Sequence, residues 1–313
     1  MGVITPSLNQ GHYLAANIES LLGQGVNAKH VIIDGGSTDE TLDVLQSYSQ
    51  NIACWVSEKD SGQSQAINKG LRLLDCDFIT WLNSDDYYLP NALMGACLLL
   101  RENPDLDVVF GSAQLVDSQN NIIGIDHGQK YGQPYRFYSG MCFPQPSSII
   151  RSSTLSLVGE LSESLHYAMD YELFLRIKLL GGCFHRFDFP LAAYRLHSSS
   201  KTVSSPISFA DEWLQVYNNF VHDEPSAYKI INALKALGFY RAQTKTYERH
   251  HHLDSHSLEM TFYYSLHYQA FFRYQAKQYD EARRISLYML KYKPFNRLMP
   301  PILRLWLSSL IKK

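Results

Sequence analysis

Two adjacent carboxylates follow an apolar segment in the first third of the sequence. Phe78–Leu82 is mostly hydrophobic, and Asn83-Ser84-Asp85-Asp86 comes directly after it. Neighbouring carboxylates repel each other unless a cation or solvent lies between them. Oxygen ligands with few protein contacts suit Mg²⁺ or Mn²⁺, which keep bound waters and take substrate phosphates as further ligands. Taken alone, this tetrad would still favour a solvated turn, or the cap of a helix that starts after Pro90.

Two further polar clusters follow apolar runs. The glycines of Asp34-Gly35-Gly36-Ser37 would let a ligand approach the backbone closely. Asp34 can accept a hydrogen bond from the imide of a uracil or from a ribose hydroxyl, although ordinary turn chemistry explains it equally well. The spacing is not G-x-G-x-x-G, so a dinucleotide-binding fold is not indicated. Further on, Asn68 and Gly70 interrupt good helical composition, which indicates either a local requirement or a frayed helix.

Alternating strands and helices would bring these clusters together. Repeated β-α-β units imply a parallel sheet with right-handed crossovers, in which ligands bind at the carboxyl ends of the strands. The expected strands are Val3–Thr5, His30–Asp34, Ala53–Ser57 and Asp77–Leu82. The expected helices are Tyr13–Gln24, Thr38–Tyr48, Gln63–Leu74 and Pro90–Glu102, the second with a capping box formed by Ser37 and Glu40.

The pattern becomes less regular after the first hundred residues. Asp107–Asp117 and Ile122–Asp126 flank a polar tetrad and predict a hairpin. Apolar spacing predicts a helix near Asp170–Leu180, closed by two glycines. Cys183–Phe189 and Leu191–Leu196 are expected to form two more strands.

The last third of the chain is helical in pattern. A polar stretch ending at Ser205 predicts a boundary between a domain of residues 1–204 and an extension of residues 205–313. His267–Pro294 resembles one tetratricopeptide-type helix pair, which is weak evidence because such repeats need stacked neighbours. Leu298–Lys313 mixes Leu, Ile and Trp306 with basic residues, and fits a membrane-interface helix and a helix packed on the first domain equally well.

Together, five segments of the chain resemble the family 2 glycosyltransferases. Each motif is loose alone, but their order and spacing are highly specific, and the resemblance covers about Val3 to Lys201. The segments are Ile4–Gln10, Ile33–Asp39, Asp60-x-Gly62 through Asn68-x-Gly70, Trp81–Asp86 and Tyr167–Leu173.

The resemblance implies a GT-A fold: an α/β, Rossmann-like, mostly parallel central sheet flanked by helices, here with an α-helical C-terminal extension. It also implies a nucleoside-diphosphate sugar donor, most often a UDP-sugar, a divalent metal (Mn²⁺ or Mg²⁺) and inversion at the anomeric carbon. Asn83 and Asp85 occupy the ends of the family's Asp-x-Asp motif, so Asp85 would bind the metal directly, while the Asn83 amide brings less negative charge. The donor site would comprise Thr5, Pro6, Ser7, Asp34, Asp60, Asn68, Asn83 and Ser84.

On the same resemblance, Asp170 would be the catalytic base. It matches the Asp of the family's Glu-Asp pair, whose Glu is replaced by Met169. A positioned carboxylate can take the proton of a sugar hydroxyl, which is a poor nucleophile at neutral pH. Inversion places the base and the leaving diphosphate on opposite faces of the sugar, so Asp170 should face Asp85 across a gap. Asp170 also begins a helix, where the dipole alone would favour a carboxylate.

Three more residues belong to the expected site. Gln145 and Arg195 would lie on the acceptor side, with Arg195 near the diphosphate. His197 would ligate the metal or bond a phosphate oxygen, and a surface hydrogen bond explains it equally well. His250-His251-His252 lies outside the resemblance and indicates a solvated surface rather than a metal site.

The composition is that of a globular protein, with 45% hydrophobic and 19% charged residues. A net charge of −2 gives no reason to expect a nucleic-acid partner, although the end from Glu281 holds eight basic residues and one acid. Five dispersed cysteines argue against a disulfide framework and predict buried free thiols. The sequence leaves no room for a signal peptide, and it has no apolar run long enough to span a membrane, so we expect a cytoplasmic protein. If its basic end binds lipid, the protein would be peripheral at the inner face of the membrane.

The leading hypothesis is therefore a glycosyltransferase that moves a sugar to a glycan or lipid-linked acceptor. A catalytically silent sugar-nucleotide-binding scaffold is the alternative, which Met169 and Asn83 keep open. A nucleotidyltransferase would need a basic phosphate-binding loop after the first strand, and Pro6–Gly11 has no basic residue.

Overall fold

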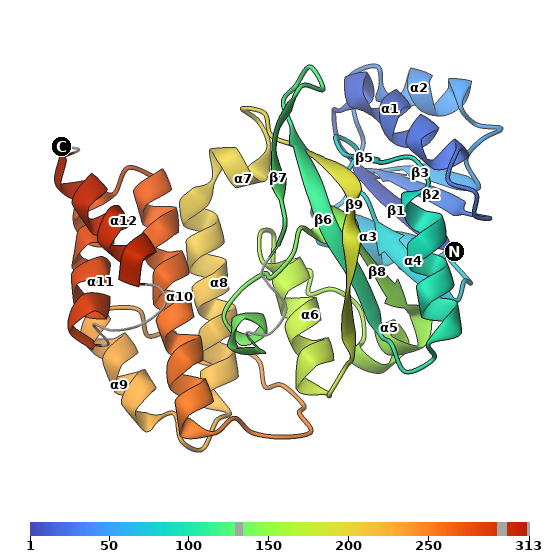
Figure 1. Cartoon of the computed structure of the whole chain (residues 1–313). Coiled ribbons are helices and arrows are strands. Elements are labelled where there is room, and N and C mark those ends of the chain that lie inside the picture. Colours follow the sequence, from blue (N-terminus) through green and yellow to red (C-terminus); the bar gives the residue numbers. More distant parts are fainter. Residues whose placement is uncertain (129–133, 293–298, 312–313) are drawn as a thin grey trace. The chain divides into compact units, whose positions relative to one another are not determined.

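The computed structural model describes residues 1–128, 134–292 and 299–311 (Figure 1). The chain forms two compact units. The first comprises Met1–Tyr131, Cys142–Leu173 and Gly181–His197; the second comprises Gly132–Met141, Phe174–Leu180 and Ser198–Lys313. The chain therefore passes between the units several times, and the division into residues 1–204 and 205–313 stays a prediction.

The first four strands of the first unit form the predicted parallel half-sheet. The strands are β1 (Gly2–Ser7), β2 (Lys29–Asp34), β3 (Cys54–Ser57) and β4 (Phe78–Trp81). The helices that follow them are α1 (Gly11–Leu22), α2 (Thr41–Ser47), α3 (Gln63–Arg72) and α4 (Ala92–Glu102). β1 pairs in parallel with β2 and with β4, and β2 pairs in parallel with β3. The four predicted strands and the four predicted helices are confirmed, with bounds that differ by at most three residues.

Alternating side chains of these strands pack on helices of opposite faces. Ile32 packs with Leu14 and Ile18 of α1. Its neighbours Val31 and Ile33 pack with Ala66 of α3 instead. This period of two is what a strand buried on both faces requires.

Gly70 lets α3 approach β1 closely. A Cβ atom at this position would lie 2.5 Å from Cγ2 of Ile4. The glycine that interrupts good helical composition therefore reflects a close helix–sheet contact.

The second half of the sheet is mixed, so the expectation of a mostly parallel sheet holds only for the first half. The strand order is β3-β2-β1-β4-β8-β6-β9-β5, with β7 also paired to β6. β8 runs antiparallel to β4 and β6, whereas β9 runs parallel to β6. The added strands are β5 (Tyr87–Tyr88), β6 (Val108–Val116), β7 (Ile122–Asp126), β8 (Ser148–Arg151) and β9 (Phe184–Arg195). Between them lie η2 (Gln145–Ser147), α5 (Ser152–Val158) and α6 (Met169–Leu179).

The hairpin of β6 and β7 is confirmed, and the prediction of two strands after Cys183 is wrong. A single strand, β9, runs through Pro190, and its register with β6 shifts on both sides of Ser112, the partner of Pro190. Proline has no N–H for the ladder, so it disturbs the pairing without ending the strand.

The second unit is helical and has an aromatic core. Trp213, Tyr217 and Phe220 of α8 are buried, and Phe220 stacks on Tyr138 with ring centroids 5.4 Å apart. Its elements are η1 (Pro134–Tyr138), α7 (Lys201–Ser204), α8 (Pro206–His222), α9 (Tyr228–Leu237), α10 (Ser255–Gln275), α11 (Tyr279–Tyr292) and α12 (Met299–Ile311). Among the residues that the structure describes, no helix has the length and apolar character needed to cross a membrane.

Candidate active site

The turn after β4 gives its two carboxylates different environments. Asp86 is fully buried, and its Oδ1 accepts the backbone N–H of Arg195 at 2.8 Å. Asn17 donates from its amide to the carbonyl oxygens of Asn83 and Asp86, both at 2.9 Å. Burial and the neighbouring charge of Asp85 raise the pKa of the Asp86 carboxyl well above its ordinary value. Asp86 therefore holds the turn from inside, and Asp85 is the carboxylate of this pair that remains partly exposed.

Asp85 lies beside His197, the second predicted metal ligand. Oδ2 of Asp85 and Nε2 of His197 are 3.0 Å apart, and their side chains are 13% and 8% exposed. The ring of Tyr13 lies 5.3 Å from the imidazole of His197, centroid to centroid. The structure thus brings together two residues that are far apart in the sequence.

Arg195 supports this turn from within the protein. The side chain is 2% exposed, and its Nε donates to the carbonyl oxygen of Asp85 at 2.7 Å. Its Nη1 donates to the carbonyl oxygen of Asp117 at 3.0 Å, and the guanidinium carbon lies 4.5 Å from the ring centroid of Tyr13. Two of its donors are therefore bonded to backbone oxygens, and the acceptor-side role of Arg195 stays a prediction.

The first two residues of the tetrad connect the turn to two other segments. Asn83 Oδ1 accepts a hydrogen bond from Nε2 of Gln63, the first residue of α3, at 2.6 Å. Ser84 is buried, and its Oγ donates to Gln10 at 3.1 Å. Sequence reasoning did not single out Gln63 or Asn17, although Asn17 lies on the core face of α1 and a buried polar side chain there signals a specific partner.

Asp34 is also used inside the protein. Its fully buried carboxylate accepts hydrogen bonds from the backbone N–H groups of Gly36 and Ser37, and from the hydroxyls of Ser37 and Ser57. These bonds fix the glycine-containing loop, so the turn interpretation of Asp34 describes the structure better than direct contact with a nucleoside. The capping-box prediction is wrong, because α2 begins only at Thr41 and the Ser37 hydroxyl is bonded to Asp34.

The end of β1 holds the three predicted residues Thr5, Pro6 and Ser7. Thr5 is fully buried and bonds Asn17 at 3.2 Å and His30 at 2.8 Å, so it also points into the core. Pro6 is buried as well. Ser7 is 5% exposed, and its Oγ has no hydrogen-bond partner within the described part of the chain. An unsatisfied buried hydroxyl at the carboxyl end of β1 leaves Ser7 as the best candidate of the three.

Asp60 approaches the loop of Asp34, as the donor-site prediction requires. One oxygen of Asp60 accepts the backbone N–H of Gly62 at 2.9 Å. The other lies so close to Gly35 that a Cβ atom there would come within 3.0 Å of it. Gly35 therefore allows the two loops to meet.

Asn68 joins α3 to the segment that leads to Asp170. It is 1% exposed, and its amide donates to the carbonyl oxygen of Leu161 and accepts the N–H of Leu161, both at 3.0 Å. Its N–H also reaches Glu163 at 3.1 Å. Both ends of the Asn68 amide are thus bonded inside the protein, and the expected contact with the donor stays a prediction.

Asp170 lies in the first turn of α6, and the segment before it is fixed on α3. The hydroxyl of Ser64 donates to the carbonyl oxygen of Leu165 at 2.7 Å, and a Cβ atom on Gly62 would lie 3.2 Å from His166. One oxygen of Asp170 accepts the backbone N–H of Tyr171 at 2.7 Å. Because Gln63 bonds Asn83, the first turns of α3 contact both the segment of Asp85 and the segment of Asp170.

Gln145 is placed behind this rim. It is 8% exposed, and its Nε2 donates to the carbonyl oxygen of Trp81 at 2.9 Å. Its amide thus supports the end of β4, and the prediction that Gln145 lines an acceptor surface stays a prediction.

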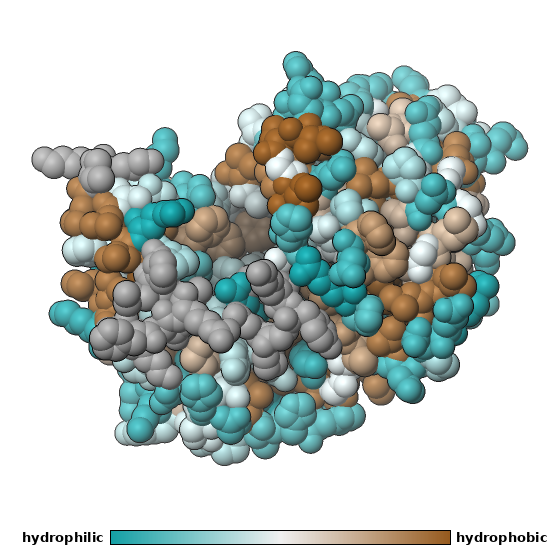
Figure 2. Space-filling model, viewed as in Figure 1, coloured by the Kyte–Doolittle hydropathy of each residue, from teal (hydrophilic) through white to brown (hydrophobic). Residues whose placement is uncertain are grey.

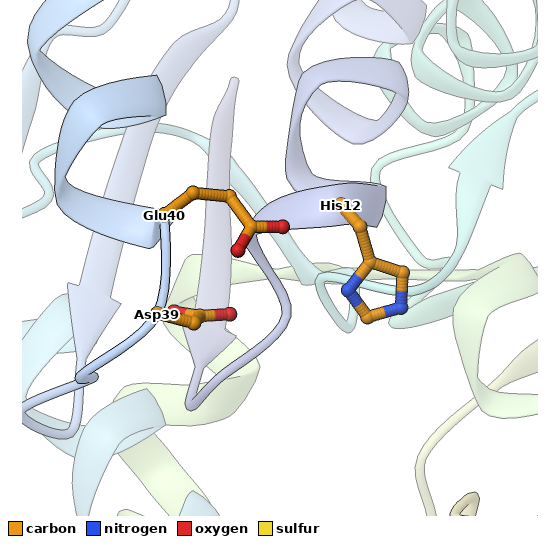
Figure 3. A group of neighbouring side chains, drawn as sticks. All are labelled: His12, Asp39 and Glu40. Atoms are coloured by element: carbon orange, nitrogen blue, oxygen red, sulfur yellow. The ribbon is translucent and has the colours of Figure 1, made fainter.

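A different group of possible ligands lies on the surface at the start of α1 and α2. His12, Asp39 and Glu40 each offer an atom within 4.8 Å of the others, and Figure 3 shows the Glu40 carboxylate turned toward His12. Asp39 accepts hydrogen bonds from the N–H groups of Gly11 and Thr41. Partial burial acts to raise its pKa, but these bonds and that of the Thr41 hydroxyl hold the pKa below its ordinary value. Asp39 thus serves the backbone, and nothing further indicates an ion here.

The sequence comparison decides the family. The model of glycosyl transferase family 2 matches residues 2–158, half of the chain. The chain belongs to this family. An uncharacterized glycosyltransferase of Rickettsia prowazekii is 25% identical over 231 residues, which cover 71% of each chain. Chondroitin synthase of Escherichia coli is 27% identical over 184 residues, which are 58% of this chain and 27% of that protein.

Solved structures of glycosyltransferases share the fold of this family 2 member. TarS 1–349 of S. aureus in complex with UDP-GlcNAc has a TM-score of 0.58 and 17% identity, over 98% of this chain and 88% of that one. The mannosyltransferase PcManGT of Pyrobaculum calidifontis, in complex with GDP-Man and Mn²⁺, has a TM-score of 0.56 and 16% identity, over 99% and 86% of the two chains. The mixed α/β sheet with flanking helices is therefore a GT-A fold, followed by C-terminal helices.

The residues at the end of β4 fit a divalent cation. Because Asp85 Oδ2 and His197 Nε2 are 3.0 Å apart, one ion at the usual distance of about 2.0–2.2 Å from each ligand can contact both atoms. Mg²⁺ takes oxygen ligands almost alone, so this mixed oxygen and nitrogen pair favours Mn²⁺.

Proposed function

We propose that this family 2 glycosyltransferase catalyses inverting transfer of a hexose from a UDP-sugar to a hydroxyl of a glycan or a lipid-linked acceptor. The observation that carries the proposal is the contact of one helix terminus with two acidic segments. α3 bonds the segment of Asp85 through Gln63, and the segment before Asp170 through Ser64. Two segments that are distant in the sequence, and that carry Asp85 and Asp170, are thereby anchored to adjacent residues of α3.

Asp170 is the proposed general base. Its carboxylate takes the proton of the acceptor hydroxyl as the oxygen forms its bond to the anomeric carbon. Asp170 lies in the first turn of α6, where a carboxylate interacts favourably with the helix dipole. Met169, in the place of the family's Glu, is 6% exposed and leaves the acceptor without a second carboxylate at this position.

Asp85 and His197 are the proposed metal ligands. A bound Mn²⁺ would supply charge neutralisation at the leaving diphosphate. Arg195, Asn17 and Asp86 hold the backbone of the turn, so they fix the direction of the Asp85 carboxylate. The Mn²⁺ complex of the mannosyltransferase with the same fold supports this choice of cation.

The proposed donor site lies along the ends of β1, β2 and β3. Ser7 offers an unsatisfied hydroxyl, and Asp60 offers a carboxylate oxygen beside the loop of Asp34. The TarS complex with UDP-GlcNAc supports a uridine nucleotide, whereas the mannosyltransferase complex holds GDP-Man. We also propose that the enzyme works in the cytoplasm, at the inner face of a membrane.

A test of the proposed function is donor turnover with a panel of nucleotide sugars and Mn²⁺. We expect one UDP-sugar to raise the thermal midpoint and to be consumed with release of UDP when acceptor is supplied. Asp170→Asn should keep the thermal shift and lose transfer by about 100- to 10,000-fold, the usual contribution of a general base. Wild-type transfer by Asp170→Asn would rule out this base.

A silent sugar-nucleotide-binding scaffold is the second candidate, and the buried Met169 favours it. The same panel separates the two. A scaffold would show the thermal shift with a UDP-sugar but would release no UDP with any acceptor.

A further inference from the structure

α12 packs on its neighbours with one narrow face. Ile302 and Ser309 are fully buried, and the carbonyl oxygen of Ser309 accepts a hydrogen bond from Nη2 of Arg283 in α11 at 2.6 Å. These residues recur seven positions apart, on one side of the helix. The inner face of α12 is therefore satisfied within the second unit.

A second face of α12, about 120° around the helix from the buried one at 100° per residue, carries leucines that the described chain leaves partly exposed. Leu303, Leu307 and Leu310 are 38%, 46% and 45% exposed. Their spacing of i, i+4 and i+7 aligns them in one apolar stripe. Trp306, beside the stripe, is partly exposed. In Figure 2 several brown residues lie at the left edge of the view, among white and teal ones. We call this stripe the leucine face of α12.

The end of the chain that contains α12 has an excess of positive charge in its sequence. The chain from Glu281 to its end has eight basic residues and a single acid. Arg304 is exposed on α12 itself, and Lys291 is exposed at the end of α11. A second copy of this chain would bring the same excess of positive charge to the interface, which is unfavourable. An anionic surface is the complementary partner.

The dimensions of α12 favour a helix that lies in a bilayer interface. Its 13 residues span about 20 Å at 1.5 Å per residue, too short for a hydrocarbon core of about 30 Å. Leucines on one face, a tryptophan at its edge and basic residues around it are the features of an interfacial amphipathic helix. The face packed on α11 and the leucine face are thus two sides of the same helix.

We infer that the leucine face of α12 inserts into the headgroup region of an anionic phospholipid bilayer, with the exposed Arg304 of the same helix on the lipid charges. This inference rests on the proposed function and deepens it. Membrane binding would hold the enzyme beside an acceptor that is carried on a membrane lipid.

The test is flotation of the full chain with phosphatidylcholine vesicles and with vesicles of equal parts phosphatidylcholine and phosphatidylglycerol. We expect binding to the anionic vesicles only, decreasing as salt is added. Leu307→Glu should weaken this binding at least about tenfold, because burial of one leucine is worth more than that factor. The matched control is Leu157→Glu in α5 of the first unit, at a leucine that is 70% exposed, and it should bind as wild type.

Three results would overturn the inference. They are no binding by the wild type, equal binding by Leu307→Glu and wild type, or a dimer in light scattering that Leu307→Glu dissociates. UDP release without vesicles is measured for the same variants. If no protein releases UDP but vesicle binding behaves as expected, the proposed function fails while the membrane surface stands. If instead UDP release is normal but binding to anionic vesicles, its salt dependence and its weakening by Leu307→Glu are all absent, the membrane surface fails while the proposed function stands.

Discussion

At the residue scale, neighbouring carboxylates of one turn have separate tasks. Asp85 points to His197, whereas Asp86 is buried on the backbone of Arg195. The sequence presented the two acids as an equivalent pair, because side-chain direction is not encoded in their order. Burial distinguishes them, since only the more exposed carboxylate can reach a cation shared with a substrate.

The division of tasks predicts opposite results for two substitutions. Asp85→Ala should weaken Mn²⁺-dependent nucleotide binding by at least about 100-fold, more than is usual for a residue that only supports a ligand. Asp86→Asn keeps an acceptor for the Arg195 N–H. It should weaken Mn²⁺-dependent nucleotide binding by no more than about tenfold. Calorimetric titration of UDP with and without Mn²⁺ measures both. Equal losses in the two variants would contradict the assignment.

His30 predicts how stability depends on acid. Burial lowers the pKa of His30 to about 3 from an ordinary 6.5, and its Nε2 bonds Thr5. Below pH 6.5, His30 is therefore protonated in the unfolded chain but stays neutral in the folded chain. The free energy of unfolding consequently falls by up to about 1.4 kcal/mol per pH unit as pH drops from 6.5 towards 3.

Urea unfolding of His30→Gln checks this linkage. The variant should be less stable than wild type at neutral pH, because the Thr5 contact is disturbed. The difference should shrink by about 2 kcal/mol between pH 6.5 and about pH 5, since glutamine does not titrate. A difference that stays constant with pH would mean that His30 is protonated in the fold.

The residue types in the sequence predicted where the site lies more reliably than they predicted the role of each residue in it. Asp85 and His197 do come together, and Ser7 and Asp60 lie at the expected rim. Other polar residues of the same motifs form hydrogen bonds inside the protein. Thr5, Asp34, Asn68, Gln145 and Arg195 satisfy buried backbone or side-chain groups. A sequence shows that a polar residue is present, but whether it serves the fold or a ligand depends on partners brought by long-range folding.

At the element scale, strands with local signals could be predicted and those that depend on distant pairing could not. β1 to β4 and the β6–β7 hairpin follow from alternating apolar runs and turn residues. The antiparallel β8 is four residues long and pairs with β4 and β6, far away in the chain. β9 continues through a proline because β6 holds it on one side.

The expectation of buried cysteines is wrong for Cys54 and Cys183. Both residues are exposed, because they lie near strand ends.

Contact between α3 and β1 gives a prediction about packing. Gly70→Ala places a methyl group 2.5 Å from Ile4 and should cost about 1–3 kcal/mol of unfolding free energy, the usual range for overpacking. Because α3 also bonds the segments of Asp85 and Asp170, transfer should fall as well. Gly23→Ala, where nothing lies within 4 Å of the new Cβ atom, is the matched control and should change stability by less than about 0.5 kcal/mol. Chemical denaturation of both variants decides, and equal stabilities would mean that α3 moves freely.

At the scale of the whole molecule, the second unit is built from three separate stretches of the chain. Residues 132–141 and 174–180 belong to it together with everything after His197. Tyr138 is 3% exposed and stacks on Phe220 of α8. The backbone N–H of His250 donates to the carbonyl oxygen of Leu179 at 2.9 Å. A chain that ends at residue 204 would therefore keep two inserted stretches without their partners.

We accordingly expect residues 1–204 to fold poorly when produced alone. Loss of α8 would expose Tyr138, and full exposure of one large aromatic side chain costs about 1.5–3 kcal/mol before any other contact is counted. The fragment should bind a hydrophobic dye and unfold at a lower temperature than the full chain, whereas Tyr138→Ser in the full chain should reproduce only part of the loss. A fragment with the thermal midpoint and UDP binding of the full chain would instead support the boundary predicted from the sequence. The decisive contacts are aromatic and buried, so added salt should not restore the fragment.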